Sequence, residues 1–326
     1  MKIGIPRALA TYEYPILYTK FFELLKIDII LSDDTDREIL NEGILKSIDE
    51  SCLASKVFIG HVDALAKRND LDYIFIPRIC TFTKTDTVCV KFYAMYDICK
   101  NIFPNSKFVT LNIDYLKGEN EFKAFVKLGK KLGKRYSDIV IAYLKAKQMQ
   151  RAYDYKKLEE QIKRINNSEN KNNILIVSHR YISHDKYMGY PVIKYLKDQN
   201  INIIYAGIND ITTKKSIRKI RRNSKNIGYE NISKNIYWKY SKDLLNGVDQ
   251  YLDKVDGIIY LSVFPCGPDS LVNELAIRKI TSKPSLNIII DEQDSNTGLY
   301  TRLESFIDIL EQLKLKSSDK LEESVV

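Results

Sequence analysis

Short apolar runs alternate with longer stretches of helical periodicity along the whole chain. A run of four to eight apolar residues bounded by turn formers is typical of a buried strand, whereas apolar residues three or four positions apart are typical of a helix. The alternation predicts parallel βαβ units, because a helix usually connects two parallel strands. The predicted strands are 2–6, 27–31, 73–77, 108–113, 174–178, 201–206, 257–263 and 286–291.

The helical stretches fall between these runs. The last helix is the clearest, because Leu299, Leu303, Phe306 and Leu310 follow the spacing of a single buried stripe. A polar, lysine-rich stretch predicts a long helix near the middle of the chain. The predicted helices before the final one are 14–25, 36–47, 54–67, 92–102, 121–134, 136–165 and a segment from 271.

A cluster of turn-forming residues, 166–173, divides the chain into two halves. We therefore predict two domains, 1–165 with the connecting helix and 166–326, each a doubly wound α/β sheet of four parallel strands. A length of 326 residues suits two domains. The segments 2–7 and 173–180 open the two halves in a similar way, which is consistent with a duplicated architecture.

Composition narrows the function classes. The net charge is +9, but the 51 basic residues are scattered among 42 acidic ones, and no nucleic-acid-binding motif accompanies them, so we expect no nucleic-acid partner. No apolar run reaches the length of a membrane span, and residues 1–6 read as a strand rather than a signal peptide, so we expect a cytoplasmic protein without a membrane partner.

Two further features concern phosphorylated ligands. The basic cluster within 214–225 is interpreted as a solvated helix face, with a phosphorylated ligand or an acidic partner as the alternative. Neither a Gly-x-Gly-x-x-Gly motif after the first strand nor a Walker-type loop is present, which argues against classical dinucleotide or ATP binding.

The most informative single residue is Cys266. It directly follows the predicted strand 257–263 and directly precedes a helical pattern. This is the carboxyl end of a parallel strand, where open α/β sheets bind their ligands. The amino end of the next helix also favours a thiolate or a bound anion. The sequence therefore predicts a reactive or ligating sulfur at this position.

We predict different roles for the other four cysteines. Cys52 and Cys89 each precede a predicted helix, so all three thiols could converge on the crevice between the domains, where thiolates favour zinc or an iron–sulfur cluster. They lack the tight pairing of zinc sites, and inert packing thiols are the alternative. Cys80 is a second-choice ligand and Cys99 is expected in the core; disulfides are not expected in a reducing compartment.

Several motifs, in order along nearly the whole chain, resemble those of the 2-hydroxyacyl-CoA dehydratase superfamily, and more narrowly its standalone branch related to CoA-dehydratase activase proteins. The segments that carry the resemblance are 1–9, Glu50-Ser51-Cys52 leading to Gly60-His61-Val62, 73–78, 264–271, and Asp291-Glu292 through 301–306.

The resemblance implies two flavodoxin-like α/β domains with a [4Fe–4S] cluster in the crevice between them, bound by Cys52, Cys89 and Cys266. It also implies a separate ATP-dependent activator protein as electron donor, an acyl-CoA substrate, and a homodimer or heterodimer. In such a reaction the thioester carbonyl takes one electron, and the resulting ketyl radical expels the adjacent hydroxyl.

Polar residues near the predicted strand ends are further candidates. We predict catalytic roles for His179, at the end of a strand, and for Arg302 and Glu304, which could orient substrate or instead form a structural network. His61 is interpreted as a structural histidine, and Asp269 and Ser270 as helix caps. The remaining candidates in these segments are His184, Asp291, Glu292 and Thr301.

Three functions are consistent with the sequence. The leading hypothesis is a dehydratase-type lyase with one-electron chemistry on an acyl-CoA. A reductase or electron-transfer component, coupled to the activator and acting on another small molecule, would keep the cluster. A cluster-free α/β binding protein would need no metal, and its cysteines would only pack.

Overall fold

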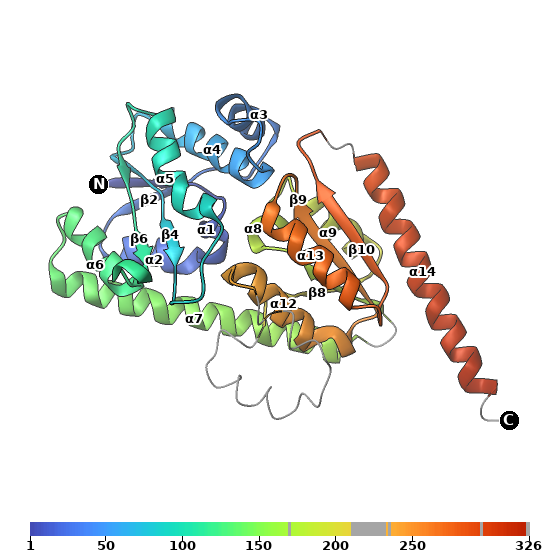
Figure 1. Cartoon of the computed structure of the whole chain (residues 1–326). Helices are drawn as coiled ribbons and strands as arrows, with labels where there is room; N and C mark the ends of the chain where they lie inside the picture. The colour runs from blue at the N-terminus through green and yellow to red at the C-terminus, as the bar shows by residue number, and fades with distance from the viewer. Residues whose placement is uncertain (169–170, 210–232, 234–235, 294–295, 324–326) are drawn as a thin grey trace.

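The computed structural model describes residues 1–168, 171–209, 233, 236–293 and 296–323 (Figure 1). The predicted basic cluster within 214–225 and part of the predicted boundary segment 166–173 lie outside these residues. Among the helices that are described, none combines the length and the apolar composition that a membrane crossing requires.

Two four-stranded sheets, both entirely parallel, form the framework. The first contains β1 (Lys2–Ile5), β2 (Asp28–Leu31), β3 (Tyr73–Phe75) and β5 (Phe108–Val109), in the order β2-β1-β3-β5. The second contains β7 (Asn173–Val177), β8 (Asn202–Tyr205), β9 (Gly257–Val263) and β10 (Ser285–Ile290), in the order β8-β7-β9-β10. Both sheets thus have the flavodoxin-like order of second, first, third and fourth strand. The predicted fold class is confirmed.

Helices connect the strands, as the alternating pattern predicts, although four of the described helices (10–13, 180–183, 190–198 and 239–251) match no predicted segment. In the first half they are α1 (Ala10–Glu13), α2 (Pro15–Leu24), α3 (Arg37–Lys46), α4 (Leu53–Ala66), α5 (Val90–Ile102), α6 (Glu121–Lys131) and α7 (Tyr136–Asn166). In the second half they are α8 (Arg180–Ser183), α9 (Tyr190–Asp198), α12 (Lys239–Tyr251), α13 (Gly267–Lys279) and α14 (Asn296–Glu323). Alternate residues of β7 belong to two different core clusters, Ile174 and Ile176 to one and Leu175 and Val177 to the other, so helices bury both faces of this sheet.

One predicted strand is wrong. The run 108–113 forms not one strand but two, β5 and β6 (Asn112–Asp114), and β6 pairs with β4 (Arg78–Thr81) in a separate two-stranded sheet. Pro77, between β3 and β4, has no amide hydrogen to donate, which interrupts the ladder of the main sheet at this point. A short apolar run does not show which strand it pairs with, so the sequence pattern predicted neither the division of 108–113 nor β4.

Helix α7 contacts both halves (Figure 1). In the first half, Gln150 accepts hydrogen bonds from the backbone amides of Ile16 and Leu17 at the start of α2, both at 3.0 Å. In the second half, Gln161 donates to the carbonyl of Tyr205 and accepts from its amide at the end of β8. The long helix is therefore a shared support, and the domain division at residue 165, close to its end, stays a prediction.

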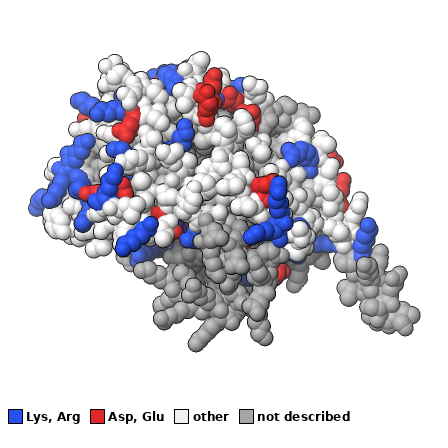
Figure 2. Space-filling view, viewed as in Figure 1, with Lys and Arg blue, Asp and Glu red and all other residues white. Residues whose placement is uncertain are grey.

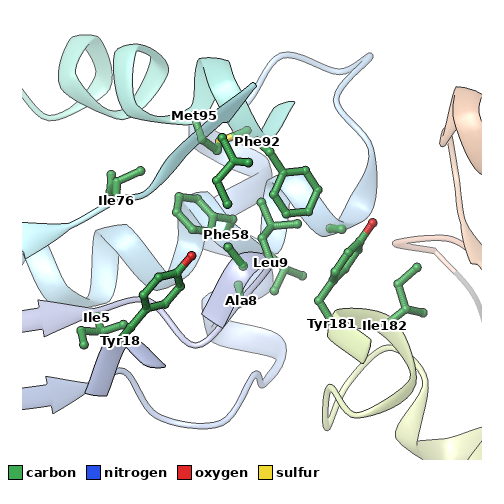
Figure 3. Close-up of a cluster of buried hydrophobic side chains, with 14 of the residues drawn as sticks. Ile5, Ala8, Leu9, Tyr18, Phe58, Ile76, Phe92, Met95, Tyr181 and Ile182 are labelled. Carbon is green, nitrogen blue, oxygen red and sulfur yellow. The ribbon is translucent and has the colours of Figure 1, made fainter. Parts of the chain in front are cut away.

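The two halves also share an apolar core. The close-up in Figure 3 shows Leu9, Phe58 and Phe92 of the first half facing Tyr181 and Ile182 of α8. All five side chains are buried and belong to one cluster. Phe92 and Tyr181 meet edge to face, with ring centroids 5.7 Å apart. Packing of this kind holds the carboxyl ends of the two sheets together.

Charged side chains lie around this core on the surface. On the face drawn in Figure 2, Lys and Arg side chains are interspersed with Asp and Glu, and apolar or uncharged residues fill the middle of the view. The distribution agrees with the scattered basic residues of the sequence.

Candidate functional site

A cleft of about 490 Å³, part of it open to solvent, lies where the carboxyl ends of the two sheets meet. Cys52, Cys89 and Cys266 all line it, although the sequence separates them widely. The other lining residues are mostly apolar or aromatic: Leu9, Ala54, Ser55, Val88, Lys91, Phe92, His179, Tyr181, Trp238, Tyr240, Ser241, Val263, Pro268 and Asp269. The three predicted ligands are therefore brought to one place, as expected of a switch-point crevice.

The cleft is built from six helix starts, three from each half. The helix after the first strand of each sheet has Leu9 or His179 as its N-cap residue. The helix before the third strand has Cys52 or Trp238, and the helix between the third and fourth strands has Cys89 or Cys266. These N-cap residues are collected in the cleft because both sheets have the same strand order.

Cys52 lies at the first turn of α4 and is tied to the opposite half. Its Sγ is 3.2 Å from the Oγ of Ser55, and the amide of Leu53 donates to the carbonyl of Phe264 at 2.9 Å. Phe264 lies two residues before Cys266, so this backbone hydrogen bond holds the two cysteine segments side by side. The spacing of these two cysteines is fixed by main-chain contact.

Cys89 ends a loop that leads from β4 into α5 and is also tied to the opposite half. The amide of Thr87 donates to the carbonyl of Tyr237 at 2.9 Å, and the amide of Lys239 donates to the carbonyl of Thr87 at 2.7 Å. Burial raises the pKa of the Cys89 thiol above its ordinary value, and the nearby Cys52 adds to this effect. The protein alone therefore keeps this sulfur protonated.

Cys266 is the N-cap residue of α13 and lies at the deepest charge pair of the cleft. Burial raises the pKa of its thiol strongly, and the carboxylate of Asp269 raises it further. The backbone amide of Asp269 acts in the opposite direction, since it donates to the sulfur. A bound cation would be needed to hold this sulfur as a thiolate.

His179 and Asp269 form a buried pair beside the cysteines. Nε2 of His179 is 2.8 Å from Oδ1 of Asp269, and the two residues are 5% and 4% exposed. Burial disfavours the imidazolium, but Asp269 outweighs it and raises the pKa of His179; burial likewise disfavours the carboxylate, but His179 outweighs it and lowers the pKa of Asp269. The ring of Tyr181 stacks on the imidazole at 5.0 Å and 12°.

The predicted capping role of Asp269 is wrong. The start of α13 has no side-chain cap, and the Asp269 carboxylate instead accepts from His179 and, at 3.3 Å, from the Oγ of Ser241. Its position three residues after Cys266 turns its side chain toward the opposite wall of the cleft, where a buried histidine is a stronger partner than a backbone amide.

Arg302 and Glu304 are not part of this cleft. Both lie exposed on α14, and neither is among the lining residues. Arg302 donates to the carbonyl of Asn287 in β10. Glu292 is also outside the lining and forms an ion pair with the buried Lys56 at 2.6 Å. Neither residue lines the cleft of the cysteines, so a catalytic role for Arg302 and Glu304 stays a prediction.

The remaining candidates serve other networks. His61 is fully buried between the hydroxyls of Ser32 and Thr35, each at 2.9 Å, and burial lowers its pKa to about 4. His184 is bonded to Ser183. Cys99 is buried in α5 as predicted, and Cys80 lies on β4. None of these four residues lines the cleft.

Sequence reasoning missed the aromatic wall formed by Phe92, Tyr181, Trp238 and Tyr240. Trp238 is the only tryptophan of the chain and directly precedes an amphipathic helix, which is the signal that could have found it. A long polar segment separates β8 from this helix in the sequence. The sequence pattern therefore gave no reason to place Trp238 at the edge of the sheet, beside the cysteines.

The donor set suits a multinuclear group better than a single ion. Within the described part of the chain, no three His, Cys, Asp or Glu side chains converge closely enough to hold one metal ion. Three cysteines on separate walls of one cleft, each at the start of a helix, are instead spaced around a larger volume. Thiolate ligands are typical of iron–sulfur clusters, and helix N-termini stabilise the negative charge of such a group.

A family model described as the CoA enzyme activase uncharacterised domain (DUF2229) matches residues 2–208, which is more than half of the chain. The chain belongs to this family. The part of the chain that matches the CoA enzyme activase domain contains Cys52, Cys89 and His179, whereas Cys266 lies beyond it. No curated protein matches the chain.

Proposed function

We propose that this CoA enzyme activase-domain protein is a [4Fe–4S] protein of the 2-hydroxyacyl-CoA dehydratase type. The observation that carries the proposal is the convergence of Cys52, Cys89 and Cys266 on one cleft at the carboxyl ends of both sheets. Membership of the CoA enzyme activase domain family supports a role in CoA-related chemistry. The motifs around the three cysteines support the narrower assignment.

The surroundings of the three thiols fit a redox cluster. The walls are mostly apolar, and the thiols of Cys89 and Cys266 are neutral in the absence of a cation because burial raises the pKa of each. A cluster would supply that cation and, when bound, single electrons at low potential. The apolar walls reduce the contact of the group with water, which favours a one-electron reaction over competing protonation.

In this role the substrate is a 2-hydroxyacyl-CoA that loses water, with no net change in electron count. A separate ATP-dependent activator protein would supply the first electron, consistent with the lack of a Walker-type loop in this chain. The aromatic wall formed by Phe92, Tyr181, Trp238 and Tyr240 suits a small acyl group. A dimeric assembly belongs to the same proposal.

A second candidate keeps the cluster but changes the substrate: a reductase or electron-transfer component, still coupled to the activator. Lys91 is the only Lys or Arg among the described residues that line the cleft. CoA carries three phosphate groups, and phosphates usually bind Arg or Lys side chains or helix N-termini. A single basic side chain gives the three phosphates of CoA one charged partner in the cleft, apart from its helix starts, which favours a substrate with less negative charge.

Iron and acid-labile sulfide content decides whether the cluster exists. Anaerobically purified protein should hold about four irons per chain, and each of Cys52→Ala, Cys89→Ala and Cys266→Ala should lose them. Cys99→Ala is the matched control, since Cys99 lies in the core away from the cleft. Absence of iron in the unaltered protein, with all variants equally stable, would leave the cluster-free binding protein.

Optical and EPR spectra then separate the two cluster-based candidates. A change in the spectrum of the reduced cluster on addition of a 2-hydroxyacyl-CoA would support the dehydratase. The same spectrum with and without CoA esters, in protein that the activator can reduce, would support the electron-transfer component.

A further inference from the structure

Four of the six helix starts around the cleft carry metal-ligating side chains. Cys52, Cys89 and Cys266 are three of them, and the fourth is His179, the N-cap residue of α8. The remaining two positions hold Leu9 and Trp238, which have no ligand chemistry. A [4Fe–4S] cluster has four irons and usually takes one protein ligand at each, so three cysteines leave one iron for a further ligand.

The imidazole of His179 is held as metal-ligating histidines are held. Such a histidine almost always donates one ring N–H to a carboxylate, a backbone carbonyl or water, which fixes the ring and leaves the other nitrogen for the metal. Here Nε2 is 2.8 Å from the carboxylate of Asp269, and Tyr181 stacks on the ring face. Because a carboxylate only accepts, Nε2 carries the hydrogen and Nδ1 is left over.

Nδ1 of His179 has no hydrogen-bond partner among the described residues, and it is also not one of their fully buried polar atoms without a partner. It therefore retains accessible surface, and the space that His179 borders is the cleft of the cysteines. Asp269 connects the two, since its carboxylate also contacts Cys266. His179, with its unused nitrogen, and the three cysteines thus line the same cleft.

Other polar residues of the cleft are engaged or unsuitable. Asp269 accepts from both His179 and Ser241. Ser55 is bonded to Cys52, Tyr240 donates to Tyr14, and Lys91 donates to Ser51. Burial raises the pKa of the Tyr181 phenol and so keeps it protonated. Imidazole is a common ligand of iron, and in some clusters it replaces cysteine.

We infer that His179, through Nδ1, is the fourth protein ligand of the proposed cluster, with Asp269 as the residue that positions it. The inference rests on the proposed function, because it requires the cluster. It also bears on the substrate. A carbonyl could bind iron only after His179 leaves it, whereas electron transfer needs no such exchange.

The deciding experiment is EPR with detection of nitrogen couplings, on the full chain purified anaerobically with ¹⁵N-labelled histidine and reduced with titanium(III) citrate. The unaltered protein should show one strongly coupled histidine nitrogen. The coupling should vanish in His179→Ala and persist in His184→Ala, a control in the same short segment whose side chain does not line the cleft.

Cyanide serves as the probe for an open iron. It should leave the spectrum of the unaltered protein unchanged and shift that of His179→Ala. Four irons per chain without a histidine coupling would overturn the ligand assignment and leave the cluster proposal intact, as would a cyanide shift already present in the unaltered protein. Absence of iron would overturn both.

Two further variants guard against failure of His179→Ala to fold. His179→Cys should retain about four irons and resist cyanide, because a thiolate takes the place of the imidazole, but it should lose the nitrogen coupling. Asp269→Asn should keep the coupling while weakening cluster retention by roughly 10- to 100-fold, the usual effect of removing a carboxylate that orients a ligating histidine. Cluster retention unchanged in Asp269→Asn would contradict the positioning role.

Discussion

The two halves of the molecule have the same strand order and place the same three helix starts at the cleft, but they differ in what those starts carry. The first half supplies Leu9, Cys52 and Cys89, and the second supplies His179, Trp238 and Cys266. Only the third pair has the same residue in both halves. A repeated backbone therefore fixes six positions, and the side chains at them decide which become ligands.

The halves also differ in how they reach their shared cysteine. In the second half only Phe264 and Pro265 separate β9 from Cys266. In the first half the chain forms β4 and a polar loop before it reaches Cys89, and that loop contacts the opposite half through Thr87. The longer segment of the first half thus links the two halves beside the cleft through the backbone hydrogen bonds of Thr87.

The largest expected effect is the loss of bound iron when either cysteine of the third pair is substituted. Cys89→Ser and Cys266→Ser should each remove most of the iron, because both positions supply a thiolate to the same group. Trp238→Ala should keep about four irons, since an indole is not a ligand. Iron analysis after anaerobic gel filtration measures this. Loss of iron in Trp238→Ala, equal to that in Cys89→Ser, would show that the aromatic wall itself retains the group.

A second comparison concerns the paired helices α4 and α12. A Cβ at Gly60 would lie 1.9 Å from the carbonyl oxygen of Ile39, and one at Gly247 would lie 1.9 Å from that of Ala206. Gly60→Ala and Gly247→Ala should each lower the free energy of unfolding by roughly 3 kcal/mol, because backbone must move to admit the methyl group. Gly267→Ala, with no neighbour within 4 Å, is the control. Urea unfolding measures the three; equal stability would contradict the close packing.

A smaller effect is expected from the ion pair between the halves. Lys56, 4% exposed on α4, lies 2.6 Å from Glu292 beyond β10. Lys56→Met should cost roughly 2 kcal/mol, at the low end for a buried pair because Glu292 is partly exposed. Arg278→Ala, which removes an exposed pair within α13, should change little. Calorimetry tests this, and a stability equal to that of the unaltered protein would show that the pair does not hold the halves together.

The smallest effect near neutral pH is a pH dependence with one histidine in each half. Burial lowers the pKa of His61 and of His184 to about 4. Between about pH 6.5 and pH 4 the unfolded chain binds these protons and the folded chain does not, so stability is lost as the pH falls. His61→Asn should reduce the slope by up to about 1.4 kcal/mol per pH unit, because His61 is fully buried. His184→Asn should reduce it by much less, because solvent screens an exposed residue. Urea unfolding between pH 4 and 7 measures the slopes, and unchanged slopes would mean that the rings are protonated in the folded protein.

Most of the framework follows from the sequence pattern. Seven of the eight predicted strands correspond to single strands of the two sheets, because parallel strands buried on both faces read as continuous apolar runs. The eighth run, 108–113, divides between two sheets, and β4 has no distinct pattern. Strand pairing depends on partners far along the chain, which local periodicity does not encode.

The candidate site also has features that the sequence predicts and features that it does not. The position of each cysteine before a helix is legible in the sequence, and the structure confirms Cys52, Cys89 and Cys266 as N-cap residues. The partner of Asp269 is not legible, because a helix cap and a cross-cleft hydrogen bond use the same residue type at the same place. His179 lies 90 residues away in sequence.

By itself, the sequence determined the α/β class, the two four-stranded units and which thiols stand at helix starts, since these depend on local periodicity and on the residues that bound each run. Only the tertiary structure decided that six helix starts surround one cleft, that α7 supports both halves and that His179 meets Asp269 there. These contacts join residues from opposite halves, and such distances are set by the packing of two sheets against a shared apolar core.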